Sequence, residues 1–119
     1  MRDKLEKLLA QGRDNALLRF GLGDACLKDG DAEQAVLHLA QATVQQPGYS
    51  AAWKLLGKAL QQQGRLDEAE AAWTTGVTVA MQQGDLQAAR EMTVFARRLQ
   101  KARDSQAQAP AATPDGAAG

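Results

Sequence analysis

The only thiol and the only imidazole in this 119-residue chain belong to Cys26 and His38. A thiolate beside an imidazole is the smallest pair that could attack a substrate, but it needs hydrogen-bond contact and a third group that orients the base. Cys26 falls in an apolar helical stripe, where a thiol is usually inert, and His38 stands between two leucines. We therefore expect both side chains to be structural and the protein not to be an enzyme.

Metal and cofactor sites are not expected either. One histidine and one cysteine cannot complete a zinc site. Residues 29–33 (Asp-Gly-Asp-Ala-Glu) lack the twelve-residue ligand spacing of a calcium loop. Residues 21–23 (Gly-Leu-Gly) lack the third glycine and the preceding strand of a dinucleotide-binding loop. The first segment therefore predicts a turn with a helix cap, and the second a close contact between helices.

The charges of the chain balance, with 14 basic and 14 acidic side chains. This balance gives no reason to expect nucleic acid or an anionic membrane as a partner. Locally, residues 14–33 carry five acids and two bases (net −3), and residues 86–103 carry five bases and one acid (net +4). No apolar run is long enough for a signal peptide or a membrane span, and a lone cysteine fits a reducing compartment. We expect a cytoplasmic protein.

Two copies of one pattern, thirty-four residues apart, fill the middle of the chain. They cover residues 16–46 and 50–80, and their matching positions are Arg19 and Trp53, Leu22 and Leu56, Gly23 and Gly57, Cys26 and Leu60, Gly30 and Gly64, Ala35 and Ala69, Leu39 and Trp73, Ala42 and Gly76, and Pro47 and Met81. A repeat of this length is one pair of antiparallel helices, which buries its apolar face by stacking on a neighbouring pair.

Apolar spacing and helix breakers predict about six helices and no strand. The helices span about 2–11, 15–28, 32–46, 50–63, 66–83 and 86–103. Asp14, Asp31 and Ser50 are the expected caps of the second, third and fourth helices, and Gln34 is placed to reach back to the amide of Asp31. Residues 104–119 have no large apolar side chain, so we expect this tail to be disordered.

The second copy resembles a tetratricopeptide repeat in the spacing of Trp53, Leu56, Gly57, Gly64, Ala69 and Trp73. The first copy departs from this pattern where Arg19 replaces the early aromatic residue. The resemblance implies an all-α fold, a short right-handed α-solenoid of antiparallel helix pairs. It divides the chain into a helical repeat domain over residues 1–103, with repeats at about 16–49 and 50–83, and the tail 104–119. Because only two repeats are complete, we expect helices 2–11 and 85–103 to act as end caps.

The resemblance also implies a non-catalytic interaction module or adaptor that holds a peptide or a helix in a concave groove. The second and fourth helices would line that groove with Leu17, Phe20, Asp24, Leu27, Lys28, Ala51, Lys54, Lys58, Gln61 and Gln62. Lys54 and Lys58 are four residues apart on one helical face, where they could meet an acidic side chain or a terminal carboxylate. The alternative is that both lysines are solvated surface side chains. For Phe20, the alternative is packing against the first helix.

Some relatives bind chaperone tails through a clamp of lysines, asparagines and an arginine spread over three inner helices. Here Phe20, Asp24 and Leu55 occupy the first clamp positions, and no third inner helix is expected, so the sequence does not support that activity. The second hypothesis for the function is a self-associating assembly subunit, a homodimer formed through the apolar edges of the first or last helix.

Overall fold

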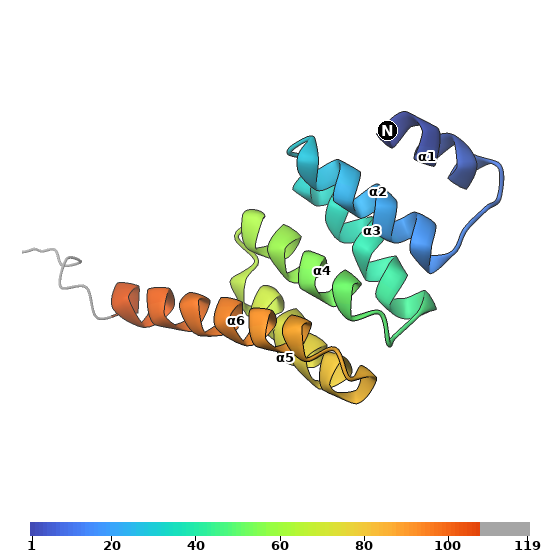
Figure 1. Ribbon diagram of the computed structural model, residues 1–119. Coiled ribbons are helices and arrows are strands. Elements are labelled where there is room, and N and C mark those ends of the chain that lie inside the picture. The colour runs from blue at the N-terminus through green and yellow to red at the C-terminus, as the bar shows by residue number, and fades with distance from the viewer. Residues whose placement is uncertain (108–119) are drawn as a thin grey trace, which may run out of the picture.

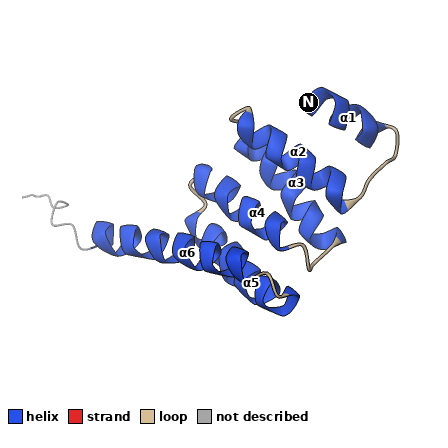
Figure 2. Cartoon of the chain, in the orientation of Figure 1, coloured by secondary structure: helices blue, strands red, loops and turns tan. Residues whose placement is uncertain are grey.

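A computed structural model describes residues 1–107 as six α-helices joined by short turns, and these residues form no strand (Figures 1 and 2). The helices are α1 (Arg2–Ala10), α2 (Ala16–Lys28), α3 (Ala32–Gln45), α4 (Ser50–Gln62), α5 (Leu66–Gln83) and α6 (Leu86–Ala107). The predicted all-α fold is confirmed. No helix within these residues is long and apolar enough to cross a membrane.

The helices form an inner and an outer layer. In the inner layer, α4 contacts both α2 and α6; in the outer layer, α3 packs on α2 and α4, and α5 packs on α4 and α6. Within residues 1–107, α1 contacts α2 alone among the helices. This is the arrangement of an α-solenoid. The expectation that no third inner helix exists is wrong, because α6 lies beside α4 as α4 lies beside α2.

Small residues at matching positions make room for large side chains of the outer helices. A Cβ atom on Gly57 would lie 2.1 Å from Nε1 of Trp73, and one on Gly23 would lie 2.3 Å from Cγ of Leu39. Trp73 is only 1% exposed, and its indole N–H donates to the carbonyl oxygen of Lys54 at 3.1 Å. Each repeat is therefore closed by one bulky residue that fits over a glycine.

The turn inside each repeat depends on a glycine with left-handed backbone. Gly30 has a φ of +78° and Gly64 a φ of +74°, a conformation that costs other residues about 1–2 kcal/mol. The next amide then turns back onto the helix: the N–H of Asp31 donates to the carbonyl of Cys26 at 2.8 Å, and that of Arg65 to the carbonyl of Leu60 at 2.9 Å. These bonds satisfy carbonyl groups at the helix ends.

The caps differ from those predicted at three points. The side chain of Asn15, and not Asp14, caps α2 by accepting from the amide of Leu18 at 2.9 Å. Asp31 does cap α3, but its own amide is already bonded to Cys26 and does not need the Gln34 side chain. Ser50 is the first residue of α4 and no cap; its hydroxyl donates to Asp85 at 3.0 Å.

The last helix is longer than expected. It was predicted to end near Arg103 but continues to Ala107, so the start of the predicted disordered tail is helical. Arg103 anchors this end to α5 through ion pairs with Asp67 and, at 2.9 Å, with Glu70. The remainder of the predicted tail, residues 108–119, lies outside the described residues.

Candidate partner-binding surfaces

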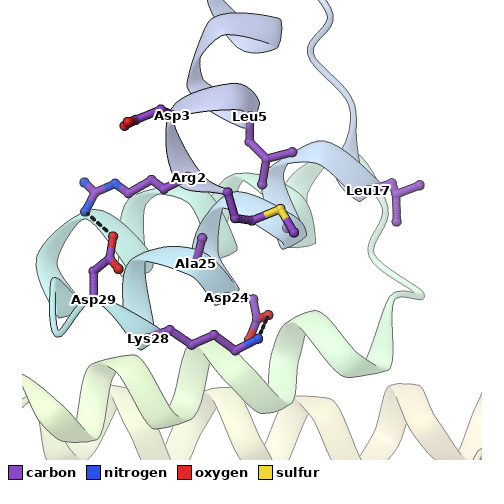
Figure 3. A pocket seen from close by; sticks show the side chains of 10 residues that line it. Arg2, Asp3, Leu5, Leu17, Asp24, Ala25, Lys28 and Asp29 are labelled. Carbon is purple, nitrogen blue, oxygen red and sulfur yellow. Dashed lines mark hydrogen bonds and ion pairs between the residues drawn. The ribbon is translucent and has the colours of Figure 1, made fainter.

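Several of the predicted groove residues line two separate recesses. Leu17, Asp24 and Lys28 line a recess of about 670 Å³ between α1 and α2, called here the end recess (Figure 3). Lys58 and Gln61 line a different recess, of about 340 Å³, between α4 and α6, called here the inner recess. The two recesses differ in both position and charge.

The end recess has an apolar floor with charged edges. Met1, Leu5 and Ala25 contribute apolar surface, and the Leu17 side chain is 72% exposed at one side (Figure 3). At the edge, Nζ of Lys28 lies 2.9 Å from a carboxylate oxygen of Asp24 within the same helix. A surface of this kind can receive an apolar side chain better than a free charge.

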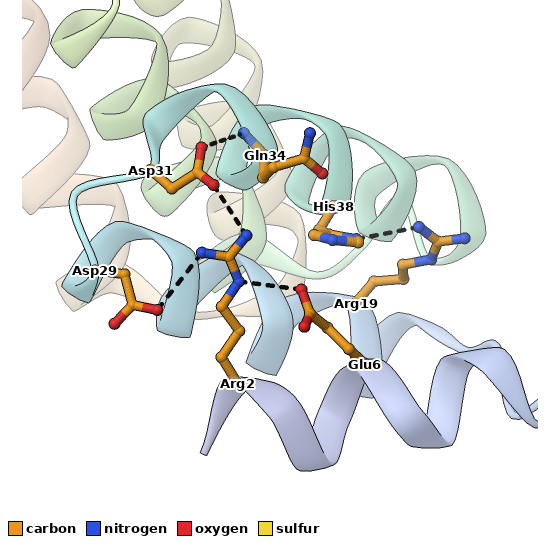
Figure 4. A network of polar contacts seen from close by, with 7 residues as sticks. All are labelled: Arg2, Glu6, Arg19, Asp29, Asp31, Gln34 and His38. Carbon is orange, nitrogen blue, oxygen red and sulfur yellow. Dashed lines mark hydrogen bonds and ion pairs between the residues drawn. The ribbon is translucent and has the colours of Figure 1, made fainter.

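Arg2 holds α1 in place beside this recess. Its guanidinium donates to Glu6 at 3.1 Å, to Asp29 at 3.5 Å and to Asp31 at 2.9 Å, so one side chain joins α1 to the turn between α2 and α3 (Figure 4). The bond with Asp31 is the main reason that the pKa of Arg2 is raised. Sequence reasoning missed this contact, because nothing in the spacing of Arg2 identifies partners almost thirty residues away.

The inner recess is basic and partly aromatic. Its other lining residues are Gln62, Trp73, Phe95 and Arg98. Nζ of Lys58 lies 4.9 Å from the centre of the Phe95 ring, which is within the range of a cation–π contact. Within residues 1–107, no carboxylate lies within 4.0 Å of the charged nitrogen atoms of Lys58 or Arg98. These two cations are therefore free to meet an external anion.

Lys54 lines neither recess, and its charge is paired within the chain. Its Nζ lies 2.8 Å from Oε1 of Glu91, so it connects α4 to α6. The hydrogen bond from Lys54 holds the pKa of the Glu91 carboxyl below its usual value. Lys54 therefore contributes to packing of the inner layer, whereas Lys58 has no carboxylate partner of this kind among residues 1–107.

The predicted aromatic groove residue packs against the segment that joins the two repeats. Phe20 stacks on Tyr49, which directly precedes α4, with 5.0 Å between ring centres and 27° between ring planes. Leu27 is half-buried and packs against the core, and Ala51 is also half-buried. Phe20 thus pairs with Tyr49, at the junction between the two repeats, a contact that neither of its two sequence hypotheses included.

The family of the chain follows from its relatives. Two family models, both described as tetratricopeptide repeat, match residues 2–50 and 27–76. A TPR repeat-containing protein of Pseudomonas aeruginosa is 56% identical over 103 residues, which is 87% of this chain and 98% of the relative. The chain belongs to the tetratricopeptide repeat family. Tetratricopeptide repeats are in general a fold for protein–protein interaction.

Two solved structures are similar to this tetratricopeptide repeat protein. The solution structure of a protein from Bordetella parapertussis is 44% identical, with a TM-score of 0.75, and the match covers 91% of this chain and 92% of that one. The crystal structure of a tetratricopeptide repeat domain protein from Salinibacter ruber is 22% identical, with a TM-score of 0.69, and the match covers 74% and 98% of the two chains. The second likeness supports the fold alone.

Cys26 and His38 have structural positions in this tetratricopeptide repeat fold. Cys26 is fully buried, and burial raises the pKa of its thiol. His38 is also buried, and a guanidinium nitrogen of Arg19 lies 3.1 Å from its Nδ1 (Figure 4). Arg19 is itself held by Asp14 at 2.8 Å. Since a guanidinium can only donate, Nδ1 is the acceptor and the ring is neutral. Burial, followed by the charge of Arg19, lowers the pKa of His38. Within residues 1–107, no hydrogen bond joins Cys26 to His38, and no group of three possible metal ligands occurs.

Proposed function

We propose that this protein is a non-catalytic adaptor that holds an acidic peptide segment in the inner recess. The observation that carries the proposal is the pair of cations, Lys58 and Arg98, that share one recess without a carboxylate partner among residues 1–107. Unpaired cations in a partly enclosed place attract carboxylates more strongly than isolated surface lysines do. The family membership supports an interaction role in general.

The surroundings of the two cations suit a peptide. Gln61 and Gln62 are exposed at the same recess, and an amide side chain can both donate to and accept from a peptide backbone. The Phe95 ring limits the freedom of the Lys58 side chain, so less entropy is lost when a ligand carboxylate binds. We expect micromolar affinity, because a short solenoid presents little contact area.

The test measures binding of a fluorescent oligoglutamate peptide by anisotropy at low and high salt. Replacing both cations, Lys58→Glu with Arg98→Glu, should weaken binding about tenfold or more, since a charge-assisted hydrogen bond contributes about 1.5–3 kcal/mol. Lys54 is left unchanged because its loss would also break the ion pair with Glu91.

The matched control is the double replacement Lys4→Glu with Lys7→Glu, at two exposed lysines on α1. It changes the net charge without touching the inner recess, so its affinity for oligoglutamate should stay within about twofold of the parent. An oligolysine peptide should not bind. Equal loss of affinity in the control, or equal binding of oligolysine, would show that the recess does not recognise acidic segments.

A further inference from the structure

We infer that copies of this chain associate head to tail, with α6 of one copy pairing with α1 of the next. Within residues 1–107, each end of the solenoid carries half of a helix pair: α1 packs on no inner helix before it, and α6 packs on no outer helix after it. When α6 of one copy packs against α1 of the next, the two helices together form one repeat that neither copy contains by itself. The surfaces involved are distinct from the inner recess, so the inference stands independently of the proposed peptide binding.

The register of the repeat identifies α1 as an outer helix. Thirty-four residues separate Leu5 in α1 from Leu39 in α3, and another thirty-four separate Leu39 from Trp73 in α5. Leu39 and Trp73 are almost fully buried against inner helices, whereas none of the nine residues of α1 is buried. The end recess therefore lies where a preceding inner helix would pack.

The same register identifies α6 as an inner helix without its outer partner. Leu86 and Val94 match Leu18 and Cys26 of the first repeat at a distance of sixty-eight residues. The first-repeat residues are 9% and 0% exposed, but Leu86 is 51% and Val94 is 40% exposed. Together with α5, these residues line a second end recess of about 350 Å³.

The exposed apolar side chains gather at these two places. Seven large apolar side chains are prominently exposed in the part of the chain that the structure describes, and five of them line one end recess or the other: Met1, Leu17, Met81, Leu86 and Val94. The helices that carry the recesses, α1 and α6, lie at opposite ends of the molecule (Figure 1). Exposed apolar surface of this kind marks an interaction site.

Charge complementarity points to a second copy as the occupant. Residues 14–33, near the first end, have a net charge of −3, and residues 86–103, at the second end, have a net charge of +4. The recess at α6 is lined by Arg90 and Arg97 and by no acid, whereas the recess at α1 is lined by three aspartates and two bases, with Asp29 paired to Arg2 and Asp24 to Lys28. One molecule thus carries a basic end and an end with a small excess of acid, and two α6 ends would repel each other.

The contact between copies should be weaker than the contacts inside the chain. Glu91 stands where Gly23 and Gly57 stand in the complete repeats, so α1 of a second copy cannot approach α6 as closely as Trp73 approaches α4. The interface is also heterologous, because it joins two different surfaces. Such a contact continues into a chain of copies or closes into a ring.

The test uses sedimentation of the full chain over a concentration series that reaches the millimolar range. Leu17→Lys should block the first end and Leu86→Lys the second, because a lysine in an apolar contact must lose its hydration. Val44→Lys and Leu37→Lys on α3 are matched controls, since these side chains are 71% and 58% exposed and lie in neither recess.

The parent chain and both controls should show a mass that rises with concentration beyond the dimer. Each blocked variant alone should stay monomeric, and an equal mixture of the two should form a dimer and nothing larger. A parent that is monomeric throughout overturns the inference, as does a mixture that forms no dimer. Dimers formed by one blocked variant alone would instead indicate a symmetric dimer through a single end, which also overturns it.

Discussion

The ammonium nitrogen of Lys54 lies 2.8 Å from a carboxylate oxygen of Glu91, and this ion pair joins α4 to α6. Both side chains are partly exposed, at 26% and 40%. The pair helps to hold the last helix in the inner layer. Lys54, which the sequence predicts to line a binding groove, therefore also contributes to the packing of α6 against α4.

The first prediction concerns the pH dependence of this pair. Because the folded-state pKa of Glu91 lies below its usual value of 4.5, its contribution to stability is present above that pH and is lost as the pH falls through the folded-state pKa. Glu91→Gln should remove this contribution and lower the melting temperature slightly at neutral pH. Urea denaturation at neutral pH and near pH 3 measures the free energy of unfolding of the parent and of the variant. The same dependence on pH in both proteins would contradict the prediction.

The second prediction concerns the fit of Trp73 over Gly57. Gly57→Ala should lower the free energy of unfolding by about 1–3 kcal/mol, because its Cβ would overlap the indole ring. Thr75→Ala, an exposed change in α5, should alter it by less than about 0.5 kcal/mol. Chemical denaturation of both variants gives the comparison, and equal stability of the two would refute the close fit.

The third prediction concerns His38, which is buried and neutral. Since its pKa in the folded protein is lowered from 6.5, stability should be fully present above pH 6.5 and should decrease as the pH falls through the folded-state pKa. His38→Gln keeps an oxygen that can accept from Arg19 but cannot titrate. The fall in urea midpoint between pH 7.5 and pH 5.5 should therefore be smaller in this variant than in the parent.

The fourth prediction concerns the attachment of α1. Arg2→Gln removes the ion pairs that join this helix to the turn before α3, and no buried residue of α1 compensates. Amide protons of residues 2–10 should lose protection from hydrogen exchange, while those of α4 keep theirs. Lys4→Gln, an exposed change in the same helix, should leave the protection of α1 unchanged.

Most of the fold could be predicted because it depends on local signals. Glycines such as Gly30 and Gly64 end helices by backbone conformation alone, and apolar spacing identifies the packed faces. The position of α6 as an inner helix was missed, because Arg90 and Glu91 replace the Leu-Gly pair by which the repeat is identified. The caps were misplaced by one residue at Asp14 and Ser50: the neighbouring Asn15 takes the role of Asp14, and the Ser50 hydroxyl bonds to Asp85 of the following repeat segment instead of capping α4.

The candidate site was harder to predict because it depends on contacts between distant segments. The residue types of the second and fourth helices gave a list of surface positions, but Lys54 is paired with Glu91 and Phe20 stacks on Tyr49. Helical periodicity specifies which face a residue occupies. It does not specify which side chain of another helix reaches that face, so Arg98 and Phe95, which share the recess with Lys58, were not identified.

The position of Trp73 gives the protein a built-in optical signal. The indole is shielded from solvent, yet it borders the same recess as Lys58. Its emission should therefore respond to occupancy of that recess without any attached dye. In a Trp53→Phe variant, Trp73 is the only tryptophan of the chain. Binding of an added peptide can then be followed by its fluorescence on the unlabelled protein.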